Sequence, residues 1–162
     1  GCRAESRIRL DLDPGAETMG WDVIALGLPA SGQSFDHGCY ATQIELPGAW
    51  LERGRLDAAD TRLLDSPLGL AGRRVLATAW FAAGSPIEAS RRDTLVDAAR
   101  ESLLASLLAR ESGVTALHPR LVVLRTLADG VEPAARLLRS VWSRWREAGW
   151  GLAPCPPRVW GL

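Results

Sequence analysis

Two carboxylates stand inside apolar, strand-like segments of this 162-residue sequence. Asp22 follows Trp21 and precedes the run Val-Ile-Ala-Leu, and Glu52 lies in the segment Ala-Trp-Leu-Glu-Arg. A carboxylate in such a setting costs free energy unless it is paired, hydrated or used. One interpretation is an ion pair, for example between Glu52 and an arginine on a neighbouring strand. The other is a pair of inward carboxylates that line a hydrated passage, because hard oxygen ligands hold a divalent cation weakly and release it.

An imidazole and a thiol stand two residues apart, at His37 and Cys39. On a strand they would share a face and could act as two weak metal ligands. No second Cys/His pair stands near them in the sequence, so alone they cannot complete a tetrahedral structural site. The alternative is a turn or strand residue beside a buried cysteine.

The usual catalytic signatures are missing from the sequence. All 19 basic residues are arginines, which excludes a Walker A lysine and a Schiff-base lysine. The two histidines, His37 and His118, have no partner at triad or metal-ligand spacing, and no G-x-S-x-G elbow occurs. We therefore expect no catalytic residue. A small metal-dependent hydrolase that uses His37, Cys39 and a carboxylate is the least favoured alternative.

Tryptophan and arginine gather towards the end of the chain. Trp145, Arg146, Arg158 and Trp160 belong to this group, and these two residue types dominate the energetics of many protein–protein interfaces. The sequence therefore predicts a partner-binding surface at these four residues. Core packing is the alternative for part of the group, above all for Trp142 on the apolar stripe of the predicted helix.

Composition limits the partners and the compartment. The formal net charge is zero, with 19 acidic and 19 basic residues, so no global field favours nucleic acid or an anionic membrane. No uncharged apolar run approaches the roughly 18 residues of a membrane span. Three widely spaced cysteines favour the reducing cytoplasm over a disulfide framework. The length predicts a single domain over residues 1–162.

The spacing of apolar residues predicts a mainly β protein with two α-helices, an α+β fold. Residues 1–84 are strand-rich, and residues 85–162 form a helix, a strand, a helix and an extended tail. The strands are predicted at 5–12, 18–27, 35–46, 50–57, 74–81 and 121–127. The first helix is predicted over 93–110 and stopped by Gly113, and its cap is either Ser90-x-x-Asp93 or the segment 85–88, which has the better capping-box form. The second helix runs from Pro133 to Gly149. Both helices are expected to cover the sheet.

Three segments resemble the signatures of one known family. They are Gly-Trp-Asp-Val-Ile-Ala-Leu-Gly-Leu-Pro-Ala-Ser-Gly at 20–32, Ser-Pro-Leu-Gly-Leu-Ala-Gly at 66–72, and Cys-Pro-Pro-Arg-Val-Trp at 155–160. In order and spacing the chain resembles the urease accessory protein family UreD, called UreH in some organisms. The resemblance implies a layered, β-helix-like accessory-protein fold without catalysis. It also implies that the chain, which begins with glycine, corresponds to the C-terminal part of longer members and is incomplete at its N-terminus.

The resemblance implies a role in urease maturation. Members of this family bind urease apoprotein and the accessory protein UreF, which recruits the GTPase UreG, and they help to deliver nickel to the urease active site. Asp22 and Glu52 match acidic residues that line the tunnel proposed for nickel. No tightly bound cofactor is then expected, only nickel in transit. The alternative is a structural protein-interaction module without metal passage.

Overall fold

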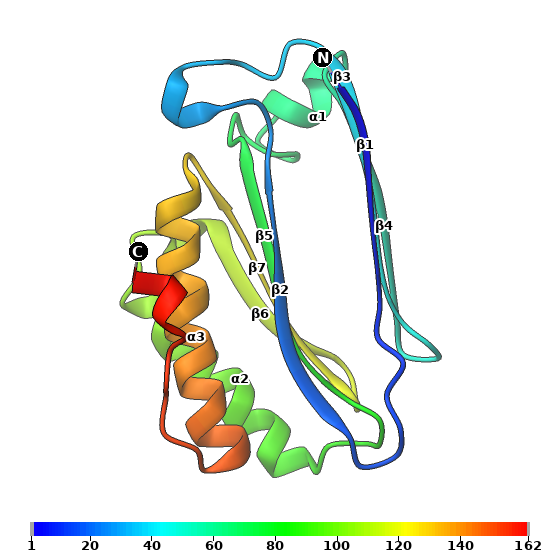
Figure 1. Ribbon diagram of the computed structural model, residues 1–162, viewed down its shortest axis with the longest axis vertical. Coiled ribbons are helices and arrows are strands. Elements are labelled where there is room, and N and C mark those ends of the chain that lie inside the picture. The colour runs from blue at the N-terminus through cyan, green and yellow to red at the C-terminus, as the bar shows by residue number, and fades with distance from the viewer. Residues whose placement is uncertain (1, 162) are drawn as a thin grey trace.

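The structure is a computed structural model that describes residues 2–161, and it is built from two β-sheets and a layer of helices (Figure 1). The three-stranded sheet has the order β1-β3-β4, with β1 Cys2–Arg9, β3 Gly38–Leu46 and β4 Trp50–Asp57. The four-stranded sheet has the order β2-β5-β7-β6, with β2 Glu17–Ala25, β5 Val75–Ala83, β7 Leu121–Ala128 and β6 Ser112–His118. The helices are α1 Thr61–Asp65, α2 Ala89–Leu104 and α3 Val131–Trp150.

The four-stranded sheet is the middle layer of the molecule. The long helices α2 and α3 cover one of its faces, and the three-stranded sheet stands opposite the other (Figure 1). All pairings in the middle sheet are antiparallel. In the outer sheet β1 runs parallel to β3, and β3 and β4 form a hairpin. The sequence in β5 explains its central place, because the nearly continuous apolar run is buried on both faces.

The predicted fold class is confirmed: the protein is mainly β with two long helices, and the expected layering takes the form of two open sheets stacked face to face. Two elements were not expected. The short helix α1 follows Asp60, whose side chain accepts a hydrogen bond from the backbone of Leu63 at 3.0 Å. Strand β6 lies where no strand was predicted and where Gly113 was interpreted as the stop of the preceding helix.

Helix α2 differs from its predicted bounds at both ends. It begins at Ala89, and the side chain of Glu88 caps it by accepting from the backbone N–H of Arg91 at 3.0 Å. Hydrogen bonds from the Ser90 hydroxyl and from the backbone of Ser90 and Arg91 lower the pKa of Glu88 to about 2. The helix ends at Leu104, so Gly113 is not its stop. Helix α3 continues to Trp150 and ends at Gly151, whose φ of 64° is the left-handed conformation that favours glycine.

A bidentate ion pair fastens the start of β2 to the helical layer. The Arg91 guanidinium donates to both carboxylate oxygens of Glu17, at 2.6 and 2.8 Å. The Trp150 Nε1–H donates to the same carboxylate at 2.7 Å, and Arg91 Nε donates to the Gly149 carbonyl at 3.2 Å. The hydrogen bond from Arg91, followed by that from Trp150, lowers the pKa of Glu17 against the opposing effect of burial.

We predict that Glu17→Gln lowers the free energy of unfolding by about 1–2 kcal/mol at neutral pH, discounted for the partial exposure of the pair. The folded-state pKa of Glu17 is lowered. The ionised carboxylate therefore contributes to folding stability above the ordinary glutamate pKa, and this contribution is lost as the pH falls. The difference between variant and wild type should therefore shrink on acidification. Urea unfolding at neutral and acidic pH measures it, and Glu132→Gln, which breaks the exposed pair with Arg136, is the control. Equal effects of the two substitutions would contradict the prediction.

Candidate functional site

A belt of polar residues crosses the space between the two sheets, and we call it the inter-sheet polar layer. Strand alternation assigns its members, because their i±2 neighbours pack in the apolar clusters between the sheets. The outer sheet contributes Ser6, Thr42 and Glu52, with Gly54 opposite Thr42, and the middle sheet contributes Asp22, Thr78 and Arg125. Register places Asp22 beside Thr78 and Thr78 beside Arg125.

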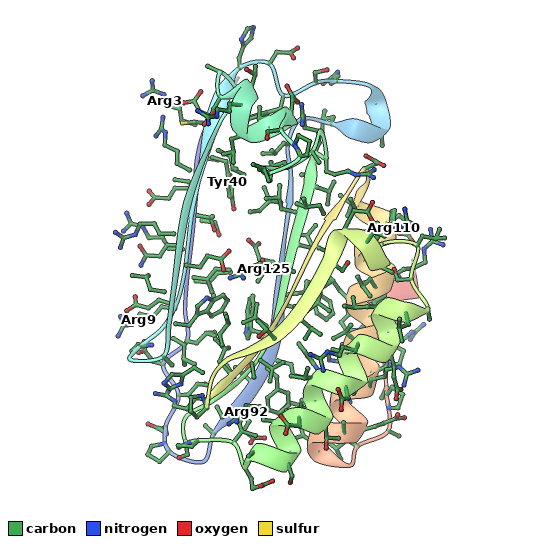
Figure 2. All side chains as sticks on the ribbon, turned by 180° about the vertical axis from the view of Figure 1, so that it is seen from behind. Arg3, Arg9, Tyr40, Arg92, Arg110 and Arg125 are labelled. Carbon is green, nitrogen blue, oxygen red and sulfur yellow. The ribbon has the colours of Figure 1, made fainter. Side chains whose placement is uncertain are left out.

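Apolar clusters close the space on both sides of this layer. The first cluster joins the turn end of β3 and β4 to β5 and β7, and consists of Ile44, Leu46, Trp50, Trp80, Ala82, Leu121 and Val123. The second lies toward α1 and consists of Leu26, Leu56, Leu64 and Leu70. Figure 2 shows Arg125 in the middle of the space between the sheets and Tyr40 nearer one end. The sequence therefore places charge where a two-sheet sandwich would ordinarily be filled by apolar side chains.

Glu52 forms an ion pair with Arg125, and this pair bridges the two sheets. An arginine on a neighbouring strand was one of the partners predicted for Glu52 from the sequence. The structure corrects the location, since Arg125 lies on β7 of the opposite sheet. The two side chains keep 29% and 47% of their surface, so the pair is in contact with solvent rather than dry. A pair of this exposure contributes little to stability.

Asp22 is half-buried, and no salt bridge within residues 2–161 joins it. Burial raises the pKa of Asp22, and a hydrogen bond with the backbone of Val23 offsets part of the increase. A desolvated carboxylate without a cationic partner gains free energy from any proton or metal cation that reaches it. Of the two carboxylates predicted from the sequence, Asp22 is thus the one with its charge available.

Two further polar atoms near this layer are buried without a hydrogen-bond partner among the described residues. They are Thr42 Oγ1 and Trp80 Nε1. A buried polar atom in this condition costs about 1–3 kcal/mol unless a polar group or water reaches it. Together with Asp22, they give the layer hydrogen-bonding capacity beyond what the protein's own groups use.

His37 and Cys39 line one pocket at the end of the inter-sheet space, a cavity of about 600 Å³. His37 is exposed and lies before β3, while Cys39 is buried within that strand. Gly38 separates them with a φ of 106°, so the regular strand geometry assumed for the two side chains does not apply. Among the described residues, no group of three His, Cys, Asp or Glu side chains is placed to hold a metal ion.

The predicted docking residues divide between core and surface. Trp145 is wrong as a surface residue, because it is only 1% exposed and its Nε1–H donates to the Leu95 carbonyl inside the helical layer. Arg146 instead lies over the Trp142 ring, 5.1 Å from its centroid. Trp160 packs between Trp21 and Trp142, with ring centroids 5.0 and 4.8 Å away.

Sequence reasoning missed Arg125, Thr42 and Thr78. Arg125 carried a usable signal, because it is the single charged residue in the apolar strand Leu-Val-Val-Leu-Arg-Thr-Leu. The two threonines carried no such signal in the sequence, since threonine is common in ordinary strands.

The fold defines a layered α+β protein. In the described part of the chain, charged side chains lie between its two sheets, in the inter-sheet polar layer. The family model described as UreD urease accessory protein matches residues 1–161, and the chain belongs to this family. It is 51% identical over 160 residues to the urease accessory protein UreD of Variovorax paradoxus, covering 99% of this chain and 58% of that protein. It is 52% identical over 159 residues to the UreD of Leptothrix cholodnii, covering 98% of this chain and 57% of that protein.

The chain therefore spans less than two thirds of the length of these relatives. The UreD of Paracidovorax citrulli gives the same proportion, with 52% identity over 161 residues, 99% of this chain and 58% of that protein. All three of these relatives are named as urease accessory proteins. In the described part of the chain, no helix has the length and apolar character needed to cross a lipid bilayer.

Proposed function

We propose that this protein acts in the cytoplasm in the maturation of urease, as a scaffold that binds urease apoprotein and UreF, and UreG through UreF. We further propose that nickel, the cargo of this assembly, passes through the inter-sheet polar layer beside Asp22 and Glu52. The family membership supports the first statement. The single observation that supports the second is a half-buried Asp22 without an ion-pair partner in the described residues, facing a polar layer between two apolar clusters.

The charges of the layer favour weak rather than tight binding. Glu52 is compensated by Arg125, so the layer's two carboxylates and one guanidinium leave a single negative charge, at Asp22. One carboxylate with hydroxyl neighbours such as Thr78 supplies hard oxygen ligands to a divalent cation, but too few to retain it. A binding step that is favourable enough for entry and weak enough for exit is the requirement for conduction.

We predict that Asp22→Asn slows nickel loading of urease by at least about tenfold while the accessory complex still assembles, because the amide keeps the shape and removes the charge. Nickel per urease in cells that co-express the variant measures this.

Stability supplies a second readout. Because burial raises the folded-state pKa of Asp22, the protonated carboxyl group stabilises the folded state only at acidic pH. This contribution to stability is lost as the pH rises through that pKa. Asp22→Asn should therefore unfold at higher urea concentration than wild type at neutral pH.

The matched control is Asp97→Asn, which removes an equal charge from the exposed surface of α2. Nickel loading should be unchanged in this variant. If Asp22→Asn binds its partners and urease acquires nickel at the wild-type rate, the passage is excluded. The protein would then be an interaction module without metal transport, which is the alternative function. If Asp22→Asn instead loses its partners, the carboxylate has a role in docking and the passage is not supported either.

A further inference from the structure

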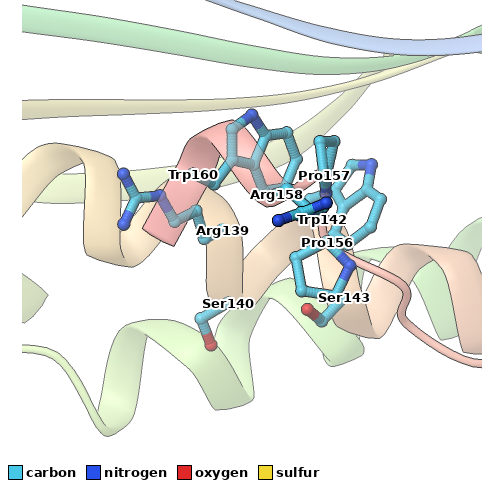
Figure 3. A pocket seen from close by; sticks show the side chains of 8 residues that line it. All are labelled: Arg139, Ser140, Trp142, Ser143, Pro156, Pro157, Arg158 and Trp160. Carbon is cyan, nitrogen blue, oxygen red and sulfur yellow. The ribbon is translucent and has the colours of Figure 1, made fainter. Parts of the chain in front are cut away.

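A pocket of about 480 Å³ lies between α3 and the C-terminal tail, away from the inter-sheet polar layer (Figure 3). Its walls come from the solvent side of α3 and from the tail, which turns back along the helix. The lining residues are Arg139, Ser140, Trp142, Ser143, Pro156, Pro157, Arg158 and Trp160. Figure 3 shows the Trp142 and Trp160 indoles with the Arg158 guanidinium gathered between helix and tail, and Arg139 to one side.

The aromatic part of the pocket is held by tertiary contacts. Trp160 packs edge-on against Trp142, with an interplanar angle of 75°, and its other neighbour is Trp21 on β2. The tail is thereby fixed to both the helix and the middle sheet. A rigid pair of indoles offers apolar contact area at little cost in conformational entropy, which is what a partner's aliphatic or aromatic side chain requires.

The charged residues that line the pocket are all basic. None of the eight described residues that line it is acidic, and no salt bridge among the described residues joins Arg139 or Arg158. Arg146 adds a third guanidinium beside the pocket, over the Trp142 ring. In a chain of zero net charge this local excess of positive charge is a specific feature rather than a consequence of composition.

We propose that this pocket binds an extended acidic segment of a protein partner. One or two carboxylates of the segment pair with Arg139 and Arg158, and an adjacent apolar side chain packs on Trp142 and Trp160. The Ser143 hydroxyl can donate to the segment's carbonyl or carboxylate oxygens, whereas the Ser140 hydroxyl already donates to Ser102 Oγ at 3.0 Å. Charge complementarity selects the acidic segment, because planar guanidinium groups form bidentate pairs with carboxylates. The inference rests on the proposed function only in that the ligand is a protein, and it does not require nickel passage.

Direct peptide binding tests the proposal without reference to nickel. The protein, expressed from its complete coding sequence, is titrated into a fluorescein-labelled peptide of alternating Asp, Glu, Leu and Trp. Matched probes replace the acidic residues by Asn and Gln, or by Lys, and a single-stranded oligouridine represents nucleic acid. We expect binding of the acidic peptide that weakens with salt, at least about tenfold tighter than binding of the neutral peptide.

The double variant Arg139→Glu/Arg158→Glu should weaken acidic-peptide binding by at least about tenfold. The control Arg62→Glu/Arg110→Glu makes the same change of charge at exposed arginines outside the pocket and should stay within about twofold of wild type. Both variants should unfold at the wild-type urea concentration, because none of the four side chains lies in the core. Equal losses in the two variants, equal binding of acidic and neutral peptides, tighter binding of oligouridine, or no peptide binding at all would each overturn the proposal.

Discussion

Replacing Trp145 with alanine is expected to lower the free energy of unfolding by about 3–5 kcal/mol, the usual range for removing a buried large aromatic side chain. Trp145 is 1% exposed and packs edge-on against Phe81, with ring centroids 6.3 Å apart and an interplanar angle of 83°. Its Nε1–H donates to the Leu95 carbonyl of α2 at 2.8 Å. The substitution would therefore leave a cavity where α2, α3 and β5 meet. Chemical unfolding of the purified protein measures the loss.

Trp142→Ala is the matched control, because it removes the same side chain from the same helix one turn earlier. Trp142 is half-buried, and its contacts are with Trp160 of the tail and with Arg146 of α3 itself. The expected loss is about 1 kcal/mol. Trp145→Phe should fall between the two alanine variants, since it keeps part of the ring packing but not the hydrogen bond. If Trp145→Ala retained its stability and lost only partner binding, the placement of Trp145 in the core would be wrong.

Local pattern predicted every strand of the described residues except β6, although it placed β1 at 5–12 instead of Cys2–Arg9, and it predicted the ends of α2 poorly. The bounds of β4 agree with the predicted 50–57, because alternating apolar residues and the preceding Pro-Gly turn are both encoded locally. Helix α2 was extended to residue 110 because Leu107 and Leu108 continue its apolar stripe. The helix ends earlier, leaving Leu107 95% exposed while Leu108 is buried. Strand β6 was missed because Gly113 was interpreted as a helix stop, although Gly113 lies in β6 and pairs with β7.

The two carboxylates of the candidate site were predictable, and their partners were not. Asp22 and Glu52 were recognised because a carboxylate in an apolar strand is unusual on chemical grounds alone. The partner of Glu52 was not predictable, since Arg125 is 73 residues away and the two strands belong to different sheets. The same limit applies to Trp142 and Trp145. Both follow the apolar stripe of α3, and the packing of α3 on α2 and β5 decides that Trp145 is the buried one.

Gly20 of the Gly-Trp-Asp segment is expected to tolerate no side chain. It lies beside Trp80 in the register of β2 and β5, on the same face as Asp22. A Cβ at this position would stand 2.6 Å from Cζ2 and 2.9 Å from Cε2 of the Trp80 indole. The ring is packed against Trp50, with centroids 6.2 Å apart, so it cannot move away freely. We predict that Gly20→Val lowers the free energy of unfolding by about 3 kcal/mol, at the upper end of the usual cost of overpacking.

A double-mutant cycle with Trp80→Phe separates this steric cause from a general intolerance of β2. A phenyl ring is smaller than an indole and lacks the Nε1 and Cζ2 atoms that approach Gly20. The replacement also removes a buried N–H that has no partner in the described residues, which offsets part of the lost packing. Gly20→Val should therefore cost about 1–2 kcal/mol less in the Trp80→Phe background, measured by urea unfolding. Strictly additive losses would show that the indole is not the obstacle, and that Gly20 is required for another property of the strand.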